Sequence, residues 1–225
     1  MPSIDYINFK ELLGLIAKQN SLAGRFIVAI CGPPGSGKST IAGLLVKRLG
    51  QCAKVVPMDG FHLDNRQLKN LGLLHRKGAP ETFDAFGFLE LVKDIRRTEN
   101  LSFPVFDRDA DKTIMDADNL GPEHKIIIIE GNYLLLKKYP WSYLKGEFDL
   151  SVYLEVSDID LEKRLTDRWI AHGLDPISAS ARALSNDMAN VKYVKEHSIL
   201  PDYRVAQTQV DTWLEILGCR AFSRL

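Results

Sequence analysis

Unbroken apolar runs along the chain predict the strands of a parallel β-sheet. They cover residues 25–31, 54–58, 125–129 and 150–155, and a weaker run covers residues 203–207. Strands that are buried on both faces read as continuous apolar segments, whereas half-exposed strands alternate apolar and polar positions. We therefore expect a mainly parallel five-stranded sheet between two layers of helices, in a single α/β/α domain that spans residues 1–225.

Apolar residues at helical spacing predict the helices that cover this sheet. Residues 1–22 carry one apolar stripe, which indicates a surface helix packed on the domain and consists of Phe9, Leu12, Leu13, Ile16 and Ala17. Further helices are expected after residue 40 and near residues 85–97. Residues 160–190 also read as helical, with Arg164 and Arg168 on a different face from Leu161, Leu165 and Trp169. We expect residues 160–190 to form a lid.

A glycine-rich segment joins the first apolar run to the helical pattern that follows it. It fits the phosphate-binding pattern G-x-x-x-x-G-K-[ST] and comprises Gly32, Pro33, Pro34, Gly35, Ser36, Gly37, Lys38, Ser39 and Thr40. In such a loop, backbone N–H groups and the helix N-terminus surround a phosphate. Lys38 would reach the terminal phosphate oxygens, and the Ser39 hydroxyl would bind Mg²⁺. The segment therefore predicts a P-loop fold that binds a nucleoside triphosphate.

Two acidic residues directly follow expected strands at the same edge of the sheet. Asp59 comes after residues 54–58, and Glu130 comes after four consecutive isoleucines. One carboxylate could take the proton of an attacking hydroxyl while the other orients Mg²⁺. The two roles could be exchanged between Asp59 and Glu130. Arg164 and Arg168 either close over the triphosphate or pair with acidic neighbours on an exposed helix.

Residues 60–122 interrupt the alternation of strand and helix. They are rich in Asp, Asn, Arg, Lys and His, and they follow the second expected strand. An insertion there emerges at the carboxyl edge of the sheet, where ligands bind in such folds, so we expect it to hold the second substrate. Asp107, Asp109 and Asp111 imitate half of a calcium loop, but Lys112 replaces the required glycine. A loop that contacts a polar substrate is therefore favoured, and His62 is a candidate contact or a surface residue.

The composition of the chain limits the kinds of binding partner that we expect. The chain has 29 basic and 29 acidic residues, so bulk charge indicates neither a nucleic-acid nor a membrane partner. Three widely spaced cysteines form no disulfide framework, which is typical of a reducing compartment, and we expect a cytoplasmic protein. The sequence leaves the oligomeric state open.

These segments together resemble the phosphoribulokinase, uridine kinase and bacterial pantothenate kinase family of P-loop small-molecule kinases. Besides residues 32–40, the resemblance rests on residues 58–62, 76–84, 104–107 and 130–133. Within this family, the sequence is similar to a branch that is labelled as fructose transport system kinases. The resemblance implies ATP, Mg²⁺ and transfer of the γ-phosphate to a hydroxyl of a small metabolite, such as a sugar, a nucleoside or a pantothenate-like alcohol.

The same resemblance implies roles for individual residues. Asp59 matches the base, Lys38, Arg164 and Arg168 match groups that act on the phosphates, and Ser39, Glu130 or Asp59 would hold the metal. The matching segments place seven residues at the acceptor: Phe61, His62, Arg76, Asp84, Phe106, Asp107 and Arg108. Two other functions stay open as alternatives, namely a nucleotide-dependent ATPase switch that acts on a protein partner and a nucleic-acid end kinase.

Overall fold

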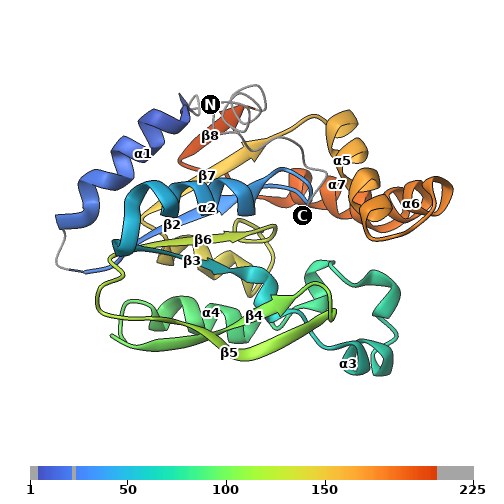
Figure 1. The fold of residues 1–225 in the computed structure, drawn as a ribbon, viewed down its shortest axis with the longest axis horizontal. Helices are drawn as coiled ribbons and strands as arrows, with labels where there is room; N and C mark the ends of the chain where they lie inside the picture. The colour runs from blue at the N-terminus through green and yellow to red at the C-terminus, as the bar shows by residue number, and fades with distance from the viewer. Residues whose placement is uncertain (1–4, 22–23, 207–225) are drawn as a thin grey trace.

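A six-stranded parallel sheet forms the centre of the computed structural model, which describes residues 5–21 and 24–206 (Figure 1). The strand order is β1-β8-β7-β2-β6-β3. The strands are β1 (Asp5–Tyr6), β2 (Phe26–Cys31), β3 (Ala53–Pro57), β6 (Ile126–Gly131), β7 (Leu150–Glu155) and β8 (Tyr203–Ala206). Every pairing in this sheet is parallel, so the P-loop α/β fold is as expected.

The expected count of five strands is wrong by one, because β1 adds a sixth. This strand has only two residues, both exposed, and it pairs with the edge strand β8. Such a short and exposed segment leaves no apolar run in the sequence. The N-terminal helix is also shorter than residues 1–22: α1 covers Phe9–Ala17. Asn8 caps it, because its side chain accepts a hydrogen bond from the Glu11 N–H. Gln207, expected in the last strand, lies outside the described residues.

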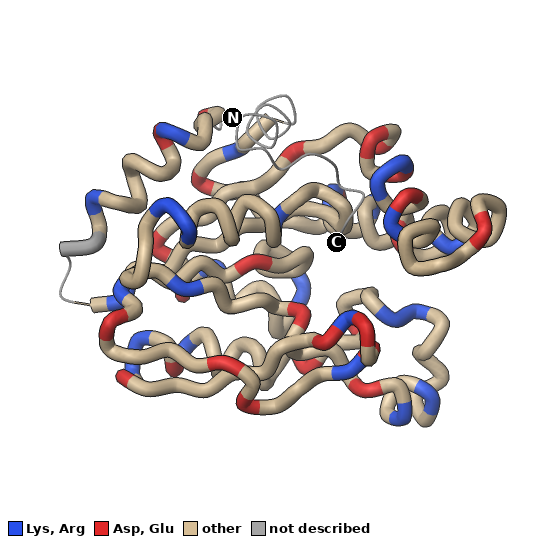
Figure 2. Tube along the Cα trace, viewed as in Figure 1, with Lys and Arg blue, Asp and Glu red and all other residues tan. Residues whose placement is uncertain are grey.

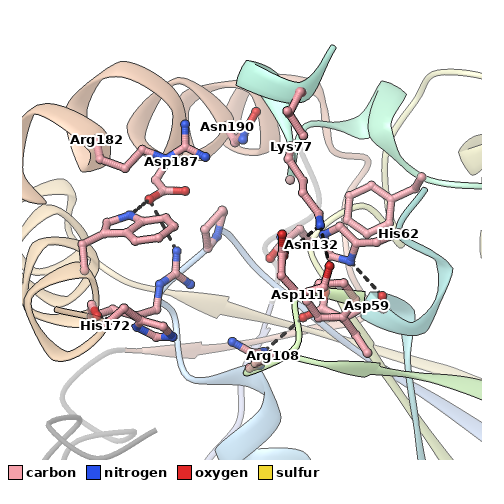
Figure 3. A pocket seen from close by; sticks show the side chains of 17 residues that line it. Asp59, His62, Lys77, Arg108, Asp111, Asn132, His172, Arg182, Asp187 and Asn190 are labelled. Atoms are coloured by element: carbon pink, nitrogen blue, oxygen red, sulfur yellow. Dashed lines mark hydrogen bonds and ion pairs between the residues drawn. The ribbon is translucent and has the colours of Figure 1, made fainter. Parts of the chain in front are cut away.

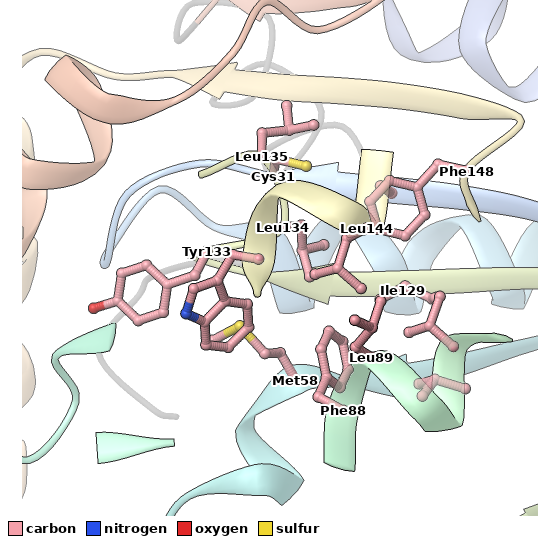
Figure 4. Packing of buried hydrophobic residues seen from close by; sticks show 14 of the residues in the cluster. Cys31, Met58, Phe88, Leu89, Ile129, Tyr133, Leu134, Leu135, Leu144 and Phe148 are labelled. Atoms are coloured by element: carbon pink, nitrogen blue, oxygen red, sulfur yellow. The ribbon is translucent and has the colours of Figure 1, made fainter. Parts of the chain in front are cut away.

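Alternate residues of the sheet pack into two separate layers of helices. Ile27 and Ala29 of β2 lie in a core with α4 (Ala85–Asp94) and α7 (Met188–His197). Val28 and Ile30 lie in the core formed with α1 and α2 (Lys38–Leu49). Figure 4 shows the first core, where Phe88 and Leu89 of α4 lie against Ile129. The unbroken apolar strands therefore follow from burial on both faces.

The insertion of residues 60–122 contains more structure than its polar sequence predicts. The helix expected near residues 85–97 is present as α4. The insertion also contains α3 (Asn65–Asn70) and an antiparallel hairpin of β4 (Leu101–Asp107) and β5 (Lys112–Leu120). Because most of β5 is exposed, its sequence carries no apolar alternation. A Cβ at Gly60 would lie 2.1 Å from the Pro104 carbonyl oxygen, so this glycine permits β4 to pass close to the end of β3.

Residues 160–190 are helical, as expected. They form α5 (Asp158–Ala171), α6 (Pro176–Arg182) and a π-helical turn, Ala183–Asp187, that leads into α7. Figure 2 shows basic and acidic residues interspersed along α5. Within the described part of the chain, no helix is both long and apolar enough to cross a membrane.

Candidate functional site

The loop between β2 and α2 has the backbone geometry of a phosphate cradle. Gly32, Gly35 and Gly37 have φ angles of 152°, 79° and 92°, which disfavour residues with a side chain. A Cβ at Gly32 would lie 2.8 Å from Ser36 Oγ and 3.0 Å from the Leu154 carbonyl oxygen. The residue that precedes α2, Gly37, has no side chain that could cap the first turn. The N–H groups of this turn therefore suit an anion such as a phosphate.

Lys38 lies inside this loop. Only 7% of the residue is exposed, and its Nζ donates to the Pro33 carbonyl oxygen at 2.9 Å. Burial lowers the pKa of Lys38 to about 8, although the nearby carboxylates of Glu130 and Asp59 oppose this effect. The ammonium group is thus held in the loop that would surround the terminal phosphates, near the carboxylates of Glu130 and Asp59.

A hydroxyl and a carboxylate meet beside the loop. Ser39 Oγ donates to Glu130 Oε1 at 3.0 Å, and Glu130 at the end of β6 is only 5% exposed. Burial is the main cause that raises the pKa of Glu130, and the negative charge of Asp59 adds to it. Oxygen donors of these two kinds fit Mg²⁺, which binds proteins through few carboxylates and hydroxyls together with substrate phosphates.

Asp59 faces the loop from the end of β3. It lies in the 3₁₀ turn Met58–Phe61, and its side chain is 27% exposed. Arg108, which follows β4, donates from Nη2 to Asp59 Oδ2 at 3.1 Å. The hairpin of the insertion therefore holds one oxygen of Asp59 and leaves the carboxylate accessible.

A cleft of about 430 Å³ lies between Asp59, the loop and the lid segment. Figure 3 shows two walls, one from the insertion and one from residues 168–190, with Asp59 and Asp187 on opposite sides. The lining residues are Pro34, Asp59, His62, Leu74, Lys77, Gly78, Phe83, Phe106, Arg108, Asp111, Asn132, Arg168, Trp169, His172, Arg182, Asp187 and Asn190. This size suits a small metabolite.

On the insertion wall, His62 lies between two aromatic rings. Its ring centroid is 4.1 Å from that of Phe83 and 4.5 Å from that of Phe106. His62 Nδ1 is 2.7 Å from the Asp59 carbonyl oxygen, so Nδ1 carries the proton and Nε2 is an acceptor in the neutral ring. Burial lowers the pKa of His62, which keeps the ring neutral at pH 7.

Lys77 connects different segments of the same wall. Its Nζ donates to Asn65 Oδ1 at 2.7 Å and to Asp111 Oδ1 at 2.8 Å. These bonds join α3, the segment before α4 and the turn of the hairpin, so Lys77 holds together three parts of the insertion.

The lid segment, residues 160–190, carries three arginines near the loop or the cleft. Arg164 Nη1 donates to the Gly35 carbonyl oxygen of the loop at 3.3 Å. Arg168 lies 3.4 Å from Asp187, and Arg182 lies 5.2 Å from the centre of the Trp169 ring. Arg168 and Arg182 thus place two cations in the lining of the cleft, whereas Arg164 contacts the phosphate loop itself.

The structure brings some of the predicted acceptor residues to the cleft, namely His62, Phe106 and Arg108, but not four others. Phe61 packs edge-to-face on Phe88 at 5.1 Å. Asp84 caps α4 by accepting from the Gly87 N–H, and Asp107 accepts from the Ala110 N–H. Arg76 donates to Asn186 Oδ1 at 3.1 Å. These four side chains support the walls from outside the lining.

Several lining residues were not predicted from the sequence. Asn132 lies one residue beyond the Glu130–Gly131 pair at the carboxyl edge of β6, and this position was a signal that could have identified it. Lys77, Trp169, Asp187 and Asn190 are positioned by contacts between distant segments, and no spacing in the sequence predicts those contacts.

The lowered pKa of Lys38 predicts pH-dependent nucleotide binding. A bound triphosphate would favour the charged ammonium, so binding above pH 8 requires uptake of a proton, whereas binding below pH 8 does not. We expect the affinity for AMP-PNP to fall by about tenfold between pH 8 and pH 9.5. Titration calorimetry in two buffers of different ionisation enthalpy measures both the affinity and the proton uptake. Equal affinity across this range, without proton uptake, would contradict the prediction.

Most of this chain is similar in sequence to a known protein family. The sequence profile of the Phosphoribulokinase / Uridine kinase family matches residues 27–198. A Schizosaccharomyces pombe protein, provisionally named a uridine kinase, is 32% identical over 221 residues, which cover 92% of this chain and 94% of that protein. The pantothenate kinase of Lactococcus lactis is 25% identical over 84% of this chain and 61% of its own length.

A solved structure shows the same fold at higher identity. It is a crystal structure from Silicibacter, provisionally named a fructose transport system kinase, with a TM-score of 0.84 and 44% identity over 88% of this chain and 98% of that one.

Proposed function

Because this chain belongs to the phosphoribulokinase / uridine kinase family, we propose that it is an ATP-dependent kinase that phosphorylates a hydroxyl of a small metabolite. The observation that carries this proposal is a cleft that is lined by both Pro34 of the phosphate loop and Asp59. A hydroxyl bound in the cleft can meet Asp59 on one side and the terminal phosphate on the other. Phosphoryl transfer needs little beyond this positioning and charge stabilisation.

Asp59 acts as the base in this proposal. Its carboxylate is accessible from the cleft, and Arg108 holds its orientation at 3.1 Å. Glu130 is more deeply buried and contacts Ser39, so these two residues would hold Mg²⁺. The contacts thus support Asp59 as the base and Glu130 as the residue that orients the metal. Bound Mg²⁺ would neutralise charge on the phosphates.

The remaining parts of the site have complementary roles. Residues 32–40 hold the phosphates, and Lys38, Arg164 and Arg168 stabilise charge on the transferred group. Residues 60–122 bind the acceptor through the wall of His62, Phe106 and Arg108, which Phe61, Arg76, Asp84 and Asp107 support from behind. Residues 160–190 form the lid, and residues 1–225 act as one domain, which we place in the cytoplasm.

The proposal includes three classes of acceptor, namely sugars, nucleosides and pantothenate-like alcohols. The test is a screen of these classes with ATP and Mg²⁺, in which ADP release is measured with and without each compound. We expect release that depends on one class of acceptor. If the rate of ADP release is the same with and without every compound but rises when a protein partner is added, the protein would instead be an ATPase switch.

A further inference from the structure

A second carboxylate faces the cleft from the wall opposite Asp59. Asp187 ends the π-helical turn Ala183–Asp187, and only 7% of the residue is exposed. Figure 3 shows it across the cleft from Asp59. Turns of this type are rare and recur at functional sites, because the extra residue redirects neighbouring side chains.

The protein itself occupies one oxygen of this carboxylate. Trp169 Nε1 donates to Asp187 Oδ2 at 2.6 Å, and Arg168 Nη2 lies 3.4 Å from the same oxygen. Among the described residues, no donor contacts Oδ1, and in Figure 3 this oxygen is directed into the cleft. A carboxylate has acceptor sites on both oxygens, so those of Oδ1 are available to a ligand.

Asn190 adds a second acceptor to the same wall. It lies three residues after Asp187, and therefore on the same side of the helix. The residue is 1% exposed and lines the cleft. Its Oδ1 is buried without a hydrogen-bond partner in the described part of the chain. Buried polar atoms are normally paired, so this wall contains an acceptor that has no donor among the described residues.

The charges around Asp187 disfavour a charged ligand group at this position. The guanidinium of Arg168 is 3.4 Å away, and that of Arg182 lies against the neighbouring Trp169 ring. An ammonium group would be repelled by these cations, and a carboxylate would be repelled by Asp187 itself. A neutral hydroxyl can donate to Asp187 Oδ1 without either cost.

We propose that Asp187 is a specificity-determining residue that binds a second hydroxyl of the acceptor while the reacting hydroxyl meets Asp59. The inference rests on the proposed kinase function and narrows its acceptor to polyhydroxylated compounds, such as a sugar or the ribose of a nucleoside. A compound with one hydroxyl cannot engage both walls. Sites that hydrogen-bond a substrate hydroxyl discriminate strongly against analogues that lack it, because their own polar groups are then unpaired.

The test compares Asp187→Asn with Asp167→Asn, which alters an exposed carboxylate on the neighbouring face of the lid. Binding of ribose, fructose and uridine, and of their single-deoxy analogues, is measured by ligand-observed NMR in the presence of Mg²⁺ and AMP-PNP. We expect at least one parent compound to bind the wild type and Asp167→Asn equally, and Asp187→Asn at least about tenfold more weakly. One deoxy analogue should bind the wild type more weakly than its parent does, by the same factor. Asp187→Asn should not weaken the binding of this analogue any further.

Three results would overturn the assignment: equal binding of the parent compounds by Asp187→Asn and Asp167→Asn, equal binding of every deoxy analogue and its parent by the wild type, or no binding of any polyol. If Asp187→Asn does not fold, the deoxy series with the wild type decides. Acceptor-dependent ADP release by the wild type is measured separately. A failed assignment of Asp187 therefore leaves the kinase proposal standing, and a failed kinase proposal is recognised by the absence of that release.

Discussion

Asp59→Asn is expected to reduce the acceptor-dependent turnover number by at least about 100-fold, the scale of lost general-base catalysis. The amide keeps the shape of the side chain and can still accept a hydrogen bond from Arg108, but it cannot take the proton of the attacking hydroxyl. Since Asp59 does not belong to the loop of residues 32–40, the affinity for AMP-PNP should change by less than about threefold. Steady-state kinetics and calorimetry measure the two quantities.

Asp109→Asn is the matched control, because Asp109 is an exposed carboxylate in the turn that follows Arg108. It should leave both quantities unchanged. If Asp59→Asn keeps the wild-type turnover, Asp59 is not the base. If instead Glu130→Gln abolishes turnover without weakening the dependence on Mg²⁺, the roles of the two carboxylates are exchanged.

Lys38→Met is expected to lower kcat/KM for ATP by about 100- to 1,000-fold, the usual effect of removing one preorganised donor to developing charge. The same change should not lower the thermal midpoint. Lys38 is almost fully buried, and its lowered pKa shows that burial disfavours its charge in the free protein. Methionine fills similar space without that desolvation cost.

Lys47→Met on the same helix is the control, because Lys47 is exposed and lies in the last turn of α2, at the opposite end from the loop. It should leave kcat/KM unchanged. A Lys38→Met protein with normal kinetics would remove Lys38 from the phosphate site. One that is strongly destabilised would show that Lys38 mainly holds the loop through its bond to the Pro33 carbonyl oxygen.

The elements that the sequence predicts well are those whose signal is local. Residues 125–129 read as a strand because the segment is buried on both faces, and the observed strand β6 covers Ile126–Gly131. Glu130 could be identified because it directly follows four isoleucines. The phosphate loop was predicted for the same reason, since its function depends on contiguous residues. The strand β1 and the hairpin strand β5 were not predicted, because their exposed residues carry no hydrophobic pattern.

The cleft depends on contacts between distant segments, and its residues were therefore predicted less completely. Asp84 follows the expected pattern of the family, yet it caps α4 on the surface. Asp187 lies 128 residues after Asp59 and faces it only because the lid and the insertion converge at one edge of the sheet. No spacing rule in the sequence indicates that juxtaposition.

The destination of the γ-phosphate tests the central claim most directly. The protein is incubated with γ-³²P-labelled ATP, Mg²⁺ and a mixture of small polyols, and the labelled products are separated by chromatography. We predict that the wild type places the label in a phosphate ester of one polyol, and that Asp59→Asn does not. Label found only in inorganic phosphate would show transfer to water and contradict the account.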